Sequence, residues 1–293
     1  MVSFCGLRWY KNRVVVSYDM DSKDLLGGWR YSGMGGSAPE KLPPGFATSD
    51  RDGRRMLLTM AYVAAGRLLL ATSFQKMPPE VVHDLSRTFP YHSEPKSARP
   101  ADAFVREGWP QIYDFAVSPR WHQLTFYNTD LAKEAALGVN LSGDPASGAL
   151  GLDPAKEYYV YDFWNDRLAG KLKGNARLEQ TLRPGEARMM SLHQAADRPQ
   201  FISTNRHIMQ GYVDLSDEKW DPADRRLGGK SRVVAGETYK IVIATNGHRP
   251  AEAAAGTAKC GLEMLPGQDG LAVLSIDSPV SATVDWTVTF AGR

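Results

Sequence analysis

The sequence predicts a chain in two parts, an α/β segment with a parallel sheet followed by an antiparallel β-sandwich. Two short apolar runs, residues 13–18 and 67–74, each precede a helical pattern. From residue 109 onward the chain consists of about ten short alternating or aromatic runs separated by turn residues. The length of 293 residues also exceeds what one compact domain usually needs. We therefore predict domains at residues 1–108 and 109–293.

The first part has the element order of a parallel α/β sheet. RVVVSY at 13–18 holds three consecutive valines, which is typical of a strand buried on both faces. The glycine- and proline-rich stretch 27–53 is longer than a simple turn requires. RRMLLTMAYVAA at 54–65 is rich in helix-forming residues, RLLLATSF at 67–74 predicts a second buried strand, and PPEVVHDLSRTF at 78–89 predicts a second helix. Strand, helix, strand and helix in this order indicate parallel pairing.

The second part is typical of an all-β domain. Turn sequences such as SGDP, RPGE, TNGH and LPGQDG separate strand-like runs that include QIYDFAVS, WHQLTFYN, EYYVYDFW, ARMMSLHQ, IMQGYVDL and ATVDWTVTFAG. This spacing predicts a β-sandwich. Tyr161, Phe163 and Trp164 fit its core better than a carbohydrate platform. At the junction of the two parts, Arg99 and Asp102 are expected to form an interdomain ion pair.

The bulk composition narrows the class of protein. Apolar residues make up 43% and charged residues 23%, which is ordinary for a globular chain. A net charge of +2 gives no field that favours nucleic acid or an anionic membrane. No run reaches the ~20 apolar residues of a membrane helix, so we expect a soluble, cytoplasmic protein. Cys5 and Cys260 fit isolated thiols, with a single bridge left open. The six scattered histidines predict no metal site, and we expect no cofactor.

The order of these segments resembles the alpha-galactosidases (melibiases) of glycoside hydrolase families 27 and 36. In that family an Asp-x-Asp turn follows barrel strand seven, and a Met/Ala-rich helix then leads to strand eight. Asp19 and Asp21 in YDMDSKDLLG match the Asp-x-Asp, and Ala71, Thr72 and Ser73 match the end of strand eight. Further along, YYVYDFWNDRLAGKL and LEQTLRPGEARMMSLH are similar to the C-terminal β domain of the family.

The resemblance implies the C-terminal portion of a (β/α)8 barrel followed by an antiparallel β-sandwich. It also implies hydrolysis of terminal alpha-galactosides by a retaining, two-carboxylate mechanism. The family's nucleophile and acid/base lie on strands four and six, which would precede residue 13, so we expect this segment to be inactive alone. The alternative is a non-catalytic carbohydrate-binding or domain-stabilising module. An incomplete barrel exposes a sheet edge, which predicts a homo-oligomer or association with another chain.

We predict a carbohydrate ligand, with Asp19, Asp21, Trp29 and Arg30 as the substrate-binding residues. Alternation along an extended segment puts Asp19 and Asp21 on one side, with Cα atoms roughly 6.5–7 Å apart. This geometry also permits catalysis by the pair as a two-carboxylate site. A further alternative is capping of the next helix or bonding to the local backbone. The Trp29 ring is suited to stacking on a sugar, and Arg30 donates a fork of hydrogen bonds. The alternative for these two is a loop that covers the hydrophobic layer below.

Overall fold

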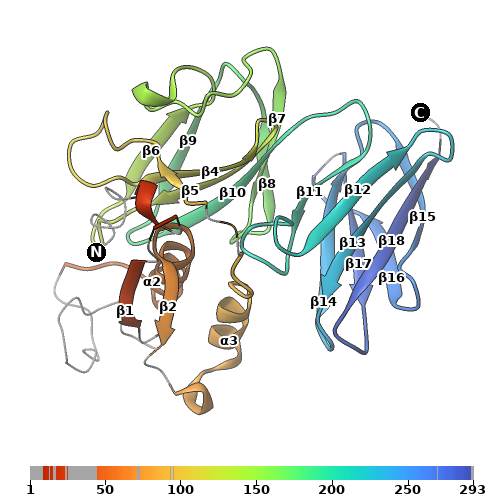
Figure 1. Ribbon diagram of the computed structural model, residues 1–293, viewed down its shortest axis with the longest axis horizontal. Coiled ribbons are helices and arrows are strands. Elements are labelled where there is room, and N and C mark those ends of the chain that lie inside the picture. The colour runs from red at the N-terminus through yellow and green to blue at the C-terminus, as the bar shows by residue number, and fades with distance from the viewer. Residues whose placement is uncertain are drawn as a thin grey trace. The chain divides into compact units, whose positions relative to one another are not determined.

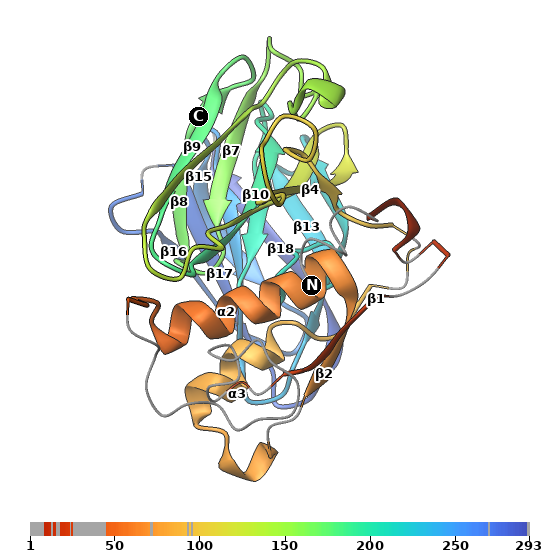
Figure 2. The ribbon, with the colours of Figure 1, turned by 90° about the vertical axis from the view of Figure 1, so that its left-hand side faces the viewer.

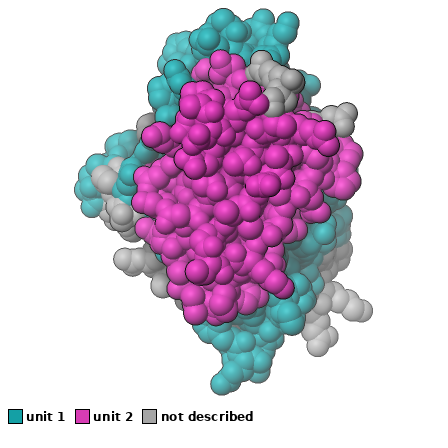
Figure 3. All heavy atoms as spheres, turned by 90° about the vertical axis from the view of Figure 1, so that its right-hand side faces the viewer, with its two compact units in different colours: residues 1–157, 172–190 teal, residues 158–171, 191–293 magenta. Residues whose placement is uncertain are grey.

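The computed structural model describes most of the chain, and its packing divides into two compact units (Figure 3). The described residues are 9–12, 14–15, 18–23, 25, 45–70, 73–92, 94, 96–268 and 270–291. Unit 1 comprises residues 1–157 and 172–190, and unit 2 comprises residues 158–171 and 191–293. Strands β7, β8 and β10 contribute residues to both units, and the domain boundary at residue 108 stays a prediction.

Strands far outnumber helices along the chain (Figure 1). The helical elements are η1 (Trp9–Lys11), α2 (Asp50–Met60), the π-helical turn η3 (Ala61–Ala65), η4 (Phe74–Lys76), α3 (Pro79–Ser86) and η5 (Pro145–Ser147). The strands are β1 (Tyr18–Lys23), β2 (Gly66–Leu70), β3 (Arg99–Pro100), β4 (Ile112–Ser118), β5 (Trp121–Tyr127), β6 (Ala135–Asn140), β7 (Glu157–Asp162), β8 (Arg167–Lys173), β9 (Arg177–Leu182), β10 (Ala187–Gln194), β11 (Gln200–Thr204), β12 (Leu215–Asp221), β13 (Arg226–Val233), β14 (Thr238–Ala244), β15 (Arg249–Ala254), β16 (Lys259–Met264), β17 (Leu271–Asp277) and β18 (Ala282–Ala291).

Strands β1 and β2 pair in parallel, as the sequence predicted. They form a two-stranded sheet of their own, apart from the antiparallel sheets that contain Trp121 and Trp286. Helix α2 and the turn η3 lie between them in the chain, and α2 and α3 lie beside the pair (Figure 2). Within the described residues there is no closed (β/α)8 barrel, so the barrel itself stays an expectation.

The position of the first strand was predicted wrongly. The valine run was expected to form it at residues 13–18, but β1 begins only at residue 18. Val14 and Val15 lie in an exposed turn, where both backbone N–H groups donate to the carbonyl of Lys11 at 3.3 and 2.9 Å. The turn uses the N–H groups of Val14 and Val15, so these groups do not pair with a neighbouring strand.

The helices next to the parallel pair are held by an apolar cluster and by well-formed helix starts. Leu68 and Leu70 of β2 pack against a buried cluster that includes Leu58 of α2 and Leu85 of α3. Helix α2 starts earlier than predicted, at residue 50, because the Ser49 hydroxyl accepts a hydrogen bond from a first-turn N–H and caps the helix.

A buried ion cluster ties α3 to α2. The Asp84 carboxylate accepts the Arg54 Nε–H at 2.9 Å on one oxygen and the Arg55 Nε–H at 3.1 Å on the other. Asp84 and Arg54 are both buried, whereas Arg55 is partly exposed. A buried charge of this kind is tolerated only while its partner is present.

The β-rich remainder contains antiparallel pairs, namely β3 with β4, β4 with β5, β6 with β9, and all neighbours within the two four-stranded sheets. One sheet has the order β3-β4-β5-β10-β7-β8, and β6 pairs with β9. Unit 2 contains two four-stranded sheets, β11-β14-β17-β16 and β12-β13-β18-β15. Tyr161, Phe163 and Trp164 are buried, as predicted for core residues. This arrangement is consistent with a β-sandwich.

One predicted strand of this region does not form. The run IMQGYVDL at 208–215 is a series of turns, and β12 begins only at residue 215. Gln210 and Gly211 have φ angles of 47° and 105°, which an extended strand does not permit. A Cβ atom on Gly211 would lie 2.6 Å from the Phe201 ring, so the turn needs glycine there.

Across the described residues, no helix combines the length and apolarity that a membrane crossing requires.

We expect Asp84→Asn to lower the free energy of unfolding by about 3–5 kcal/mol, because Arg54 would then remain buried without its counter-charge. Urea denaturation followed by circular dichroism measures the change. Glu80→Gln, on the exposed side of the same helix, is the matched control and should change stability by less than about 0.5 kcal/mol. An unchanged midpoint for Asp84→Asn would show that the cluster does not hold the helices together.

Candidate functional site

The predicted site lies at the edge where the parallel strands end. Strand β1 ends at Lys23 and β2 ends at Leu70, and these two residues are paired in the ladder. Because both strands run the same way, the segments that follow them leave from one edge of the sheet. Sites in parallel α/β structures form at this carboxyl edge. The arrangement therefore provides the kind of edge that the sequence predicted.

The aspartates of the predicted site do not follow the strand but lie within it. Asp19 is opposite Arg67, and the register shifts between Asp19 and Ser22. The prediction of a turn after the strand was wrong because the strand starts five residues later than expected. At ~3.3 Å per residue, Asp19 lies roughly 13 Å from the end of β1 and Asp21 roughly 7 Å. Of the two, Asp21 has the backbone position nearer to the edge.

The other two predicted residues, Trp29 and Arg30, lie outside the described residues. Their role in sugar binding therefore stays a prediction. Ala71 and Thr72, matched to the end of strand eight, also lie outside them, and Ser73 is exposed just beyond β2.

A polar network anchors the start of α2 to the β9–β10 turn. Arg183 donates two hydrogen bonds to the Asp52 carboxylate. Its Nε–H donates to Oδ2 at 3.0 Å, and its Nη2–H donates to Oδ1 at 2.8 Å. Glu186 accepts the Arg183 backbone N–H at 2.8 Å and the Arg188 Nε–H at 3.1 Å. Burial alone would raise the pKa of the Asp52 carboxyl, but the hydrogen bonds from Arg183 and Ser49 outweigh it and hold the pKa below its usual value. The network has the character of a structural anchor.

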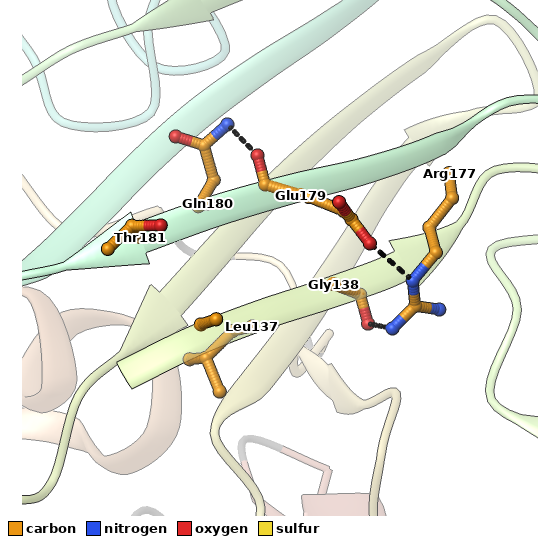
Figure 4. Close-up of a pocket in the computed structure, with 7 residues that line it drawn as sticks. Leu137, Gly138, Arg177, Glu179, Gln180 and Thr181 are labelled. Carbon is orange, nitrogen blue, oxygen red and sulfur yellow. Dashed lines mark hydrogen bonds and ion pairs between the residues drawn. The ribbon is translucent and has the colours of Figure 1, made fainter. Parts of the chain in front are cut away.

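A shallow depression of about 190 Å³ lies over the β6–β9 pair (Figure 4). It is lined by Ala136, Leu137, Gly138, Arg177, Glu179, Gln180 and Thr181. The Arg177 side chain lies across β6 and donates to the Gly138 carbonyl at 2.9 Å and to Glu179 at 3.3 Å. A Cβ atom on residue 138 would lie 2.8 Å from the guanidinium, so glycine makes room for it.

The size and chemistry of this depression do not favour a ligand. Arg177, Glu179 and Gly138 bond to one another, and the depression is smaller than the ~300–1,000 Å³ usual for small-molecule sites. Leu137, Val139 and Leu178 are buried, whereas Arg177 and Glu179 are exposed, so the pair has one apolar and one polar face. We assign the depression to the solvated face of this strand pair.

A buried histidine–carboxylate pair joins β4 and β5. His122 Nδ1 lies 2.8 Å from Asp114 Oδ1, and Arg99 approaches the other oxygen at 3.6 Å. The expected Arg99–Asp102 ion pair is therefore wrong, because Asp102 instead accepts backbone N–H groups of Gln111 and Ile112. An imidazole oriented by a carboxylate is an element of nucleophilic catalysis. Here the Asp114 carboxylate lies within a β-sheet and contacts both His122 and the Arg99 guanidinium, which indicates a structural role.

The described residues contain no group of three or more His, Cys, Asp or Glu side chains that is arranged to hold a metal ion. Sequence reasoning did not anticipate the Asp52 and Asp114 contacts, since each joins segments far apart in the chain. The alternation of Arg177, Glu179 and Thr181 along one strand was the available signal for the polar face of β9.

The comparisons with known proteins find only distant structural similarity. No family model and no curated protein matches the chain. Among solved structures, a GH27 β-L-arabinopyranosidase from Geobacillus stearothermophilus is 16% identical with a TM-score of 0.39, over 50% of this chain and 31% of that one. An isomalto-dextranase from Arthrobacter globiformis, solved with panose, is 14% identical with a TM-score of 0.36, over 84% and 46%.

The chain thus spans about a third of the arabinopyranosidase and less than half of the isomalto-dextranase. We draw no functional conclusion from similarity of this size.

A buried imidazole in unit 2 makes the fold sensitive to acid. His193 is buried on β10, with its ring centroid 5.0 Å from that of Phe201. Burial lowers the pKa of His193 to about 3 from its ordinary 6.5, because the charged form loses its hydration. The neutral form is therefore favoured in the folded protein. As pH falls below 6.5 the unfolded chain takes up the proton first, and stability is lost between about pH 6.5 and pH 3.

We expect His193→Gln to remove about 2 kcal/mol of the stability difference between pH 7 and pH 5, because glutamine does not titrate there. Urea unfolding at the two pH values measures this difference. His83→Gln, at an exposed position on α3, is the matched control and should leave the wild-type difference in place. An identical pH dependence in wild type and His193→Gln would contradict the burial argument.

Proposed function

We propose that this chain is the C-terminal part of a glycoside hydrolase of the alpha-galactosidase type. In this proposal β1 and β2 are barrel strands seven and eight, residues 1–108 belong to the barrel, and residues 109–293 form the β-sandwich domain. The observation that carries the proposal is the parallel pairing of β1 with β2, with α2 between them in the chain. Antiparallel sheets then follow, in the order that the resemblance implies.

The proposed chemistry is retaining hydrolysis of a terminal alpha-galactoside. Such a mechanism uses one carboxylate as nucleophile and another as general acid/base, about 5–5.5 Å apart. The resemblance assigns both groups to barrel strands four and six. In this proposal the present chain contributes the substrate-binding part of the rim. Asp21 and Asp19 accept hydrogen bonds from sugar hydroxyls, Trp29 stacks on the ring and Arg30 donates to its oxygens.

The carboxyl edge of β1 and β2 gives this assignment its physical basis. Because the two strands are parallel, residues late in β1 and late in β2 lie at the same edge of the sheet. Asp21 is closer to that rim than Asp19, which makes Asp21 the stronger candidate for a sugar contact.

We expect the chain to bind D-galactose, and Asp21→Asn to weaken this binding about tenfold, because a charged acceptor is replaced by a neutral amide. Isothermal titration calorimetry measures the affinity. Asp19→Asn should have a smaller effect because it lies farther from the edge. Asp224→Asn, an exposed carboxylate in the β12–β13 turn, is the matched control and should bind as wild type does.

Two results would count against the proposal. The first is the absence of galactose binding, and the second is equal binding by wild type and Asp21→Asn. We expect no release of nitrophenol from 4-nitrophenyl alpha-D-galactopyranoside by the chain alone, since the proposed nucleophile and acid/base lie on other strands. Turnover that Asp21→Asn and Asp19→Asn abolish would overturn the assignment of those residues to substrate binding.

We further propose that the edge of the two-stranded parallel sheet associates with another strand, from a second copy or from another chain. Unpaired N–H and C=O groups at a strand edge are a template for such pairing. We expect sedimentation velocity to detect a dimer or larger species at micromolar concentration. A stable monomer across the concentration series would contradict this association while leaving the sugar-binding proposal in place.

A further inference from the structure

The loop between β3 and β4 exposes large apolar side chains. Phe104 is 84% exposed, Val105 58% and Trp109 56%, all within six consecutive exposed residues. Among the tryptophan side chains that the structure describes, Trp109 alone is exposed. A protein surface usually carries such residues singly, and a contiguous group marks a contact surface. We call residues 104–109 the aromatic loop.

The exposure of the aromatic loop is not the result of a loose backbone. Asp102 closes its base by accepting the backbone N–H of Gln111 at 3.0 Å and of Ile112 at 3.1 Å. The Asp102 carbonyl also accepts the N–H groups of Val105 and Arg106 at 3.3 and 3.1 Å, which coils the first half of the loop. The backbone of the loop is therefore held at its base and along its first half, while Phe104 and Trp109 stay exposed.

A second contact supports the loop from the side. Val105 packs against residue 148, where a Cβ atom would lie 2.7 Å from a valine methyl group, so glycine is needed for the approach. The turn that carries Gly148 is itself held, because Arg99 donates to the carbonyls of Pro145 and Ala149 at 3.0 and 2.9 Å. A surface held in this way loses little conformational entropy when it binds.

We propose that the aromatic loop binds a neutral glycan chain. The inference takes its ligand class from the proposed function, but it concerns a different surface. The rings of Phe104 and Trp109 offer apolar faces for the C–H face of a pyranose. Arg106 and Glu107 lie between them in the loop, both exposed. A guanidinium donates to hydroxyl oxygens and a carboxylate accepts hydroxyl protons, so aromatic and polar groups together match a sugar.

The charge and the size of the loop decide between a glycan and other partners. One Arg and one Glu leave the loop without net charge, which gives no attraction to an anionic polymer or an anionic membrane. A stable protein–protein interface uses about 20–30 residues a side, and six residues fall well short of that. A neutral glycan chain is narrow and needs few contacts, so it fits both the absence of net charge and the small size of the loop.

Affinity electrophoresis of the whole chain in gels containing dextran, glucomannan or arabinoxylan tests this inference. These polysaccharides are neutral and contain no galactose, so they do not report on the edge of β1 and β2. We expect retardation in at least one of them and an about tenfold weaker affinity for the variant that combines Phe104→Ala with Trp109→Ala. Trp109→Tyr should retain most of the binding, because an aromatic face remains.

The variant that combines Met264→Ala with Val280→Ala removes two exposed apolar side chains elsewhere and is the matched control, which should migrate as wild type does. Circular dichroism spectra and thermal midpoints confirm that the variants are folded. No retardation in any of the three polysaccharides would overturn the inference, and so would equal retardation of wild type and the Phe104→Ala, Trp109→Ala variant. Binding to phosphatidylcholine vesicles that this variant loses, without polysaccharide binding, would also overturn it in favour of a membrane.

The design separates this inference from the proposed function. Asp21→Asn should leave polysaccharide retardation unchanged, and the Phe104→Ala, Trp109→Ala variant should leave galactose binding unchanged. Retardation without galactose binding would retain the aromatic loop as a glycan surface and reject the alpha-galactosidase proposal. Galactose binding without retardation would retain the alpha-galactosidase proposal and reject the aromatic loop as a glycan surface.

Discussion

The parallel pairing of β1 with β2 is the constraint on which the helical part of this protein depends. Two parallel strands cannot be joined by a tight turn, so the connection must cross over and cover a face of the sheet. Helix α2 is part of that connection, and its Leu58 joins the cluster that packs on β2. The same geometry brings the carboxyl ends of both strands to one edge, and this edge is the proposed sugar site.

Buried carboxylates in unit 1 hold neighbouring helices and strands together, and we assign them structural roles. Asp84 joins the two helices, Asp52 joins α2 to the β9–β10 turn, and Asp114 joins two strands to Arg99. Each carboxylate has at least one arginine within ion-pair distance. An arginine holds its charge at all relevant pH values, so such contacts persist across the physiological range. Most of the buried ionic groups of unit 1 are therefore accounted for by structure.

The sequence predicted the kind of structure better than its positions. Apolar runs and helix-forming residues identified the parallel pair and both helices, because these signals are local. The valine run misled, since hydrogen bonds from Val14 and Val15 to Lys11 form a turn that no hydropathy pattern records. The failure of the strand at 208–215 has a similar cause in the positive φ of Gln210. The candidate site was harder, because contacts such as Asp52–Arg183 join residues 131 positions apart.

The aromatic loop could not be recognised from the sequence, because it lacks the periodicity of a strand or a helix. Its sequence, FVREGW, follows no strand or helix period, and the predicted domain boundary after residue 108 falls within it. Asp102 changes this interpretation, because its carboxylate satisfies two buried N–H groups and closes the loop. An unanchored segment with Phe104 and Trp109 would gain by folding those rings inward, at about 25 cal/mol per Å² of apolar surface buried. In the folded chain both rings remain exposed, and a ligand that covers them recovers that free energy.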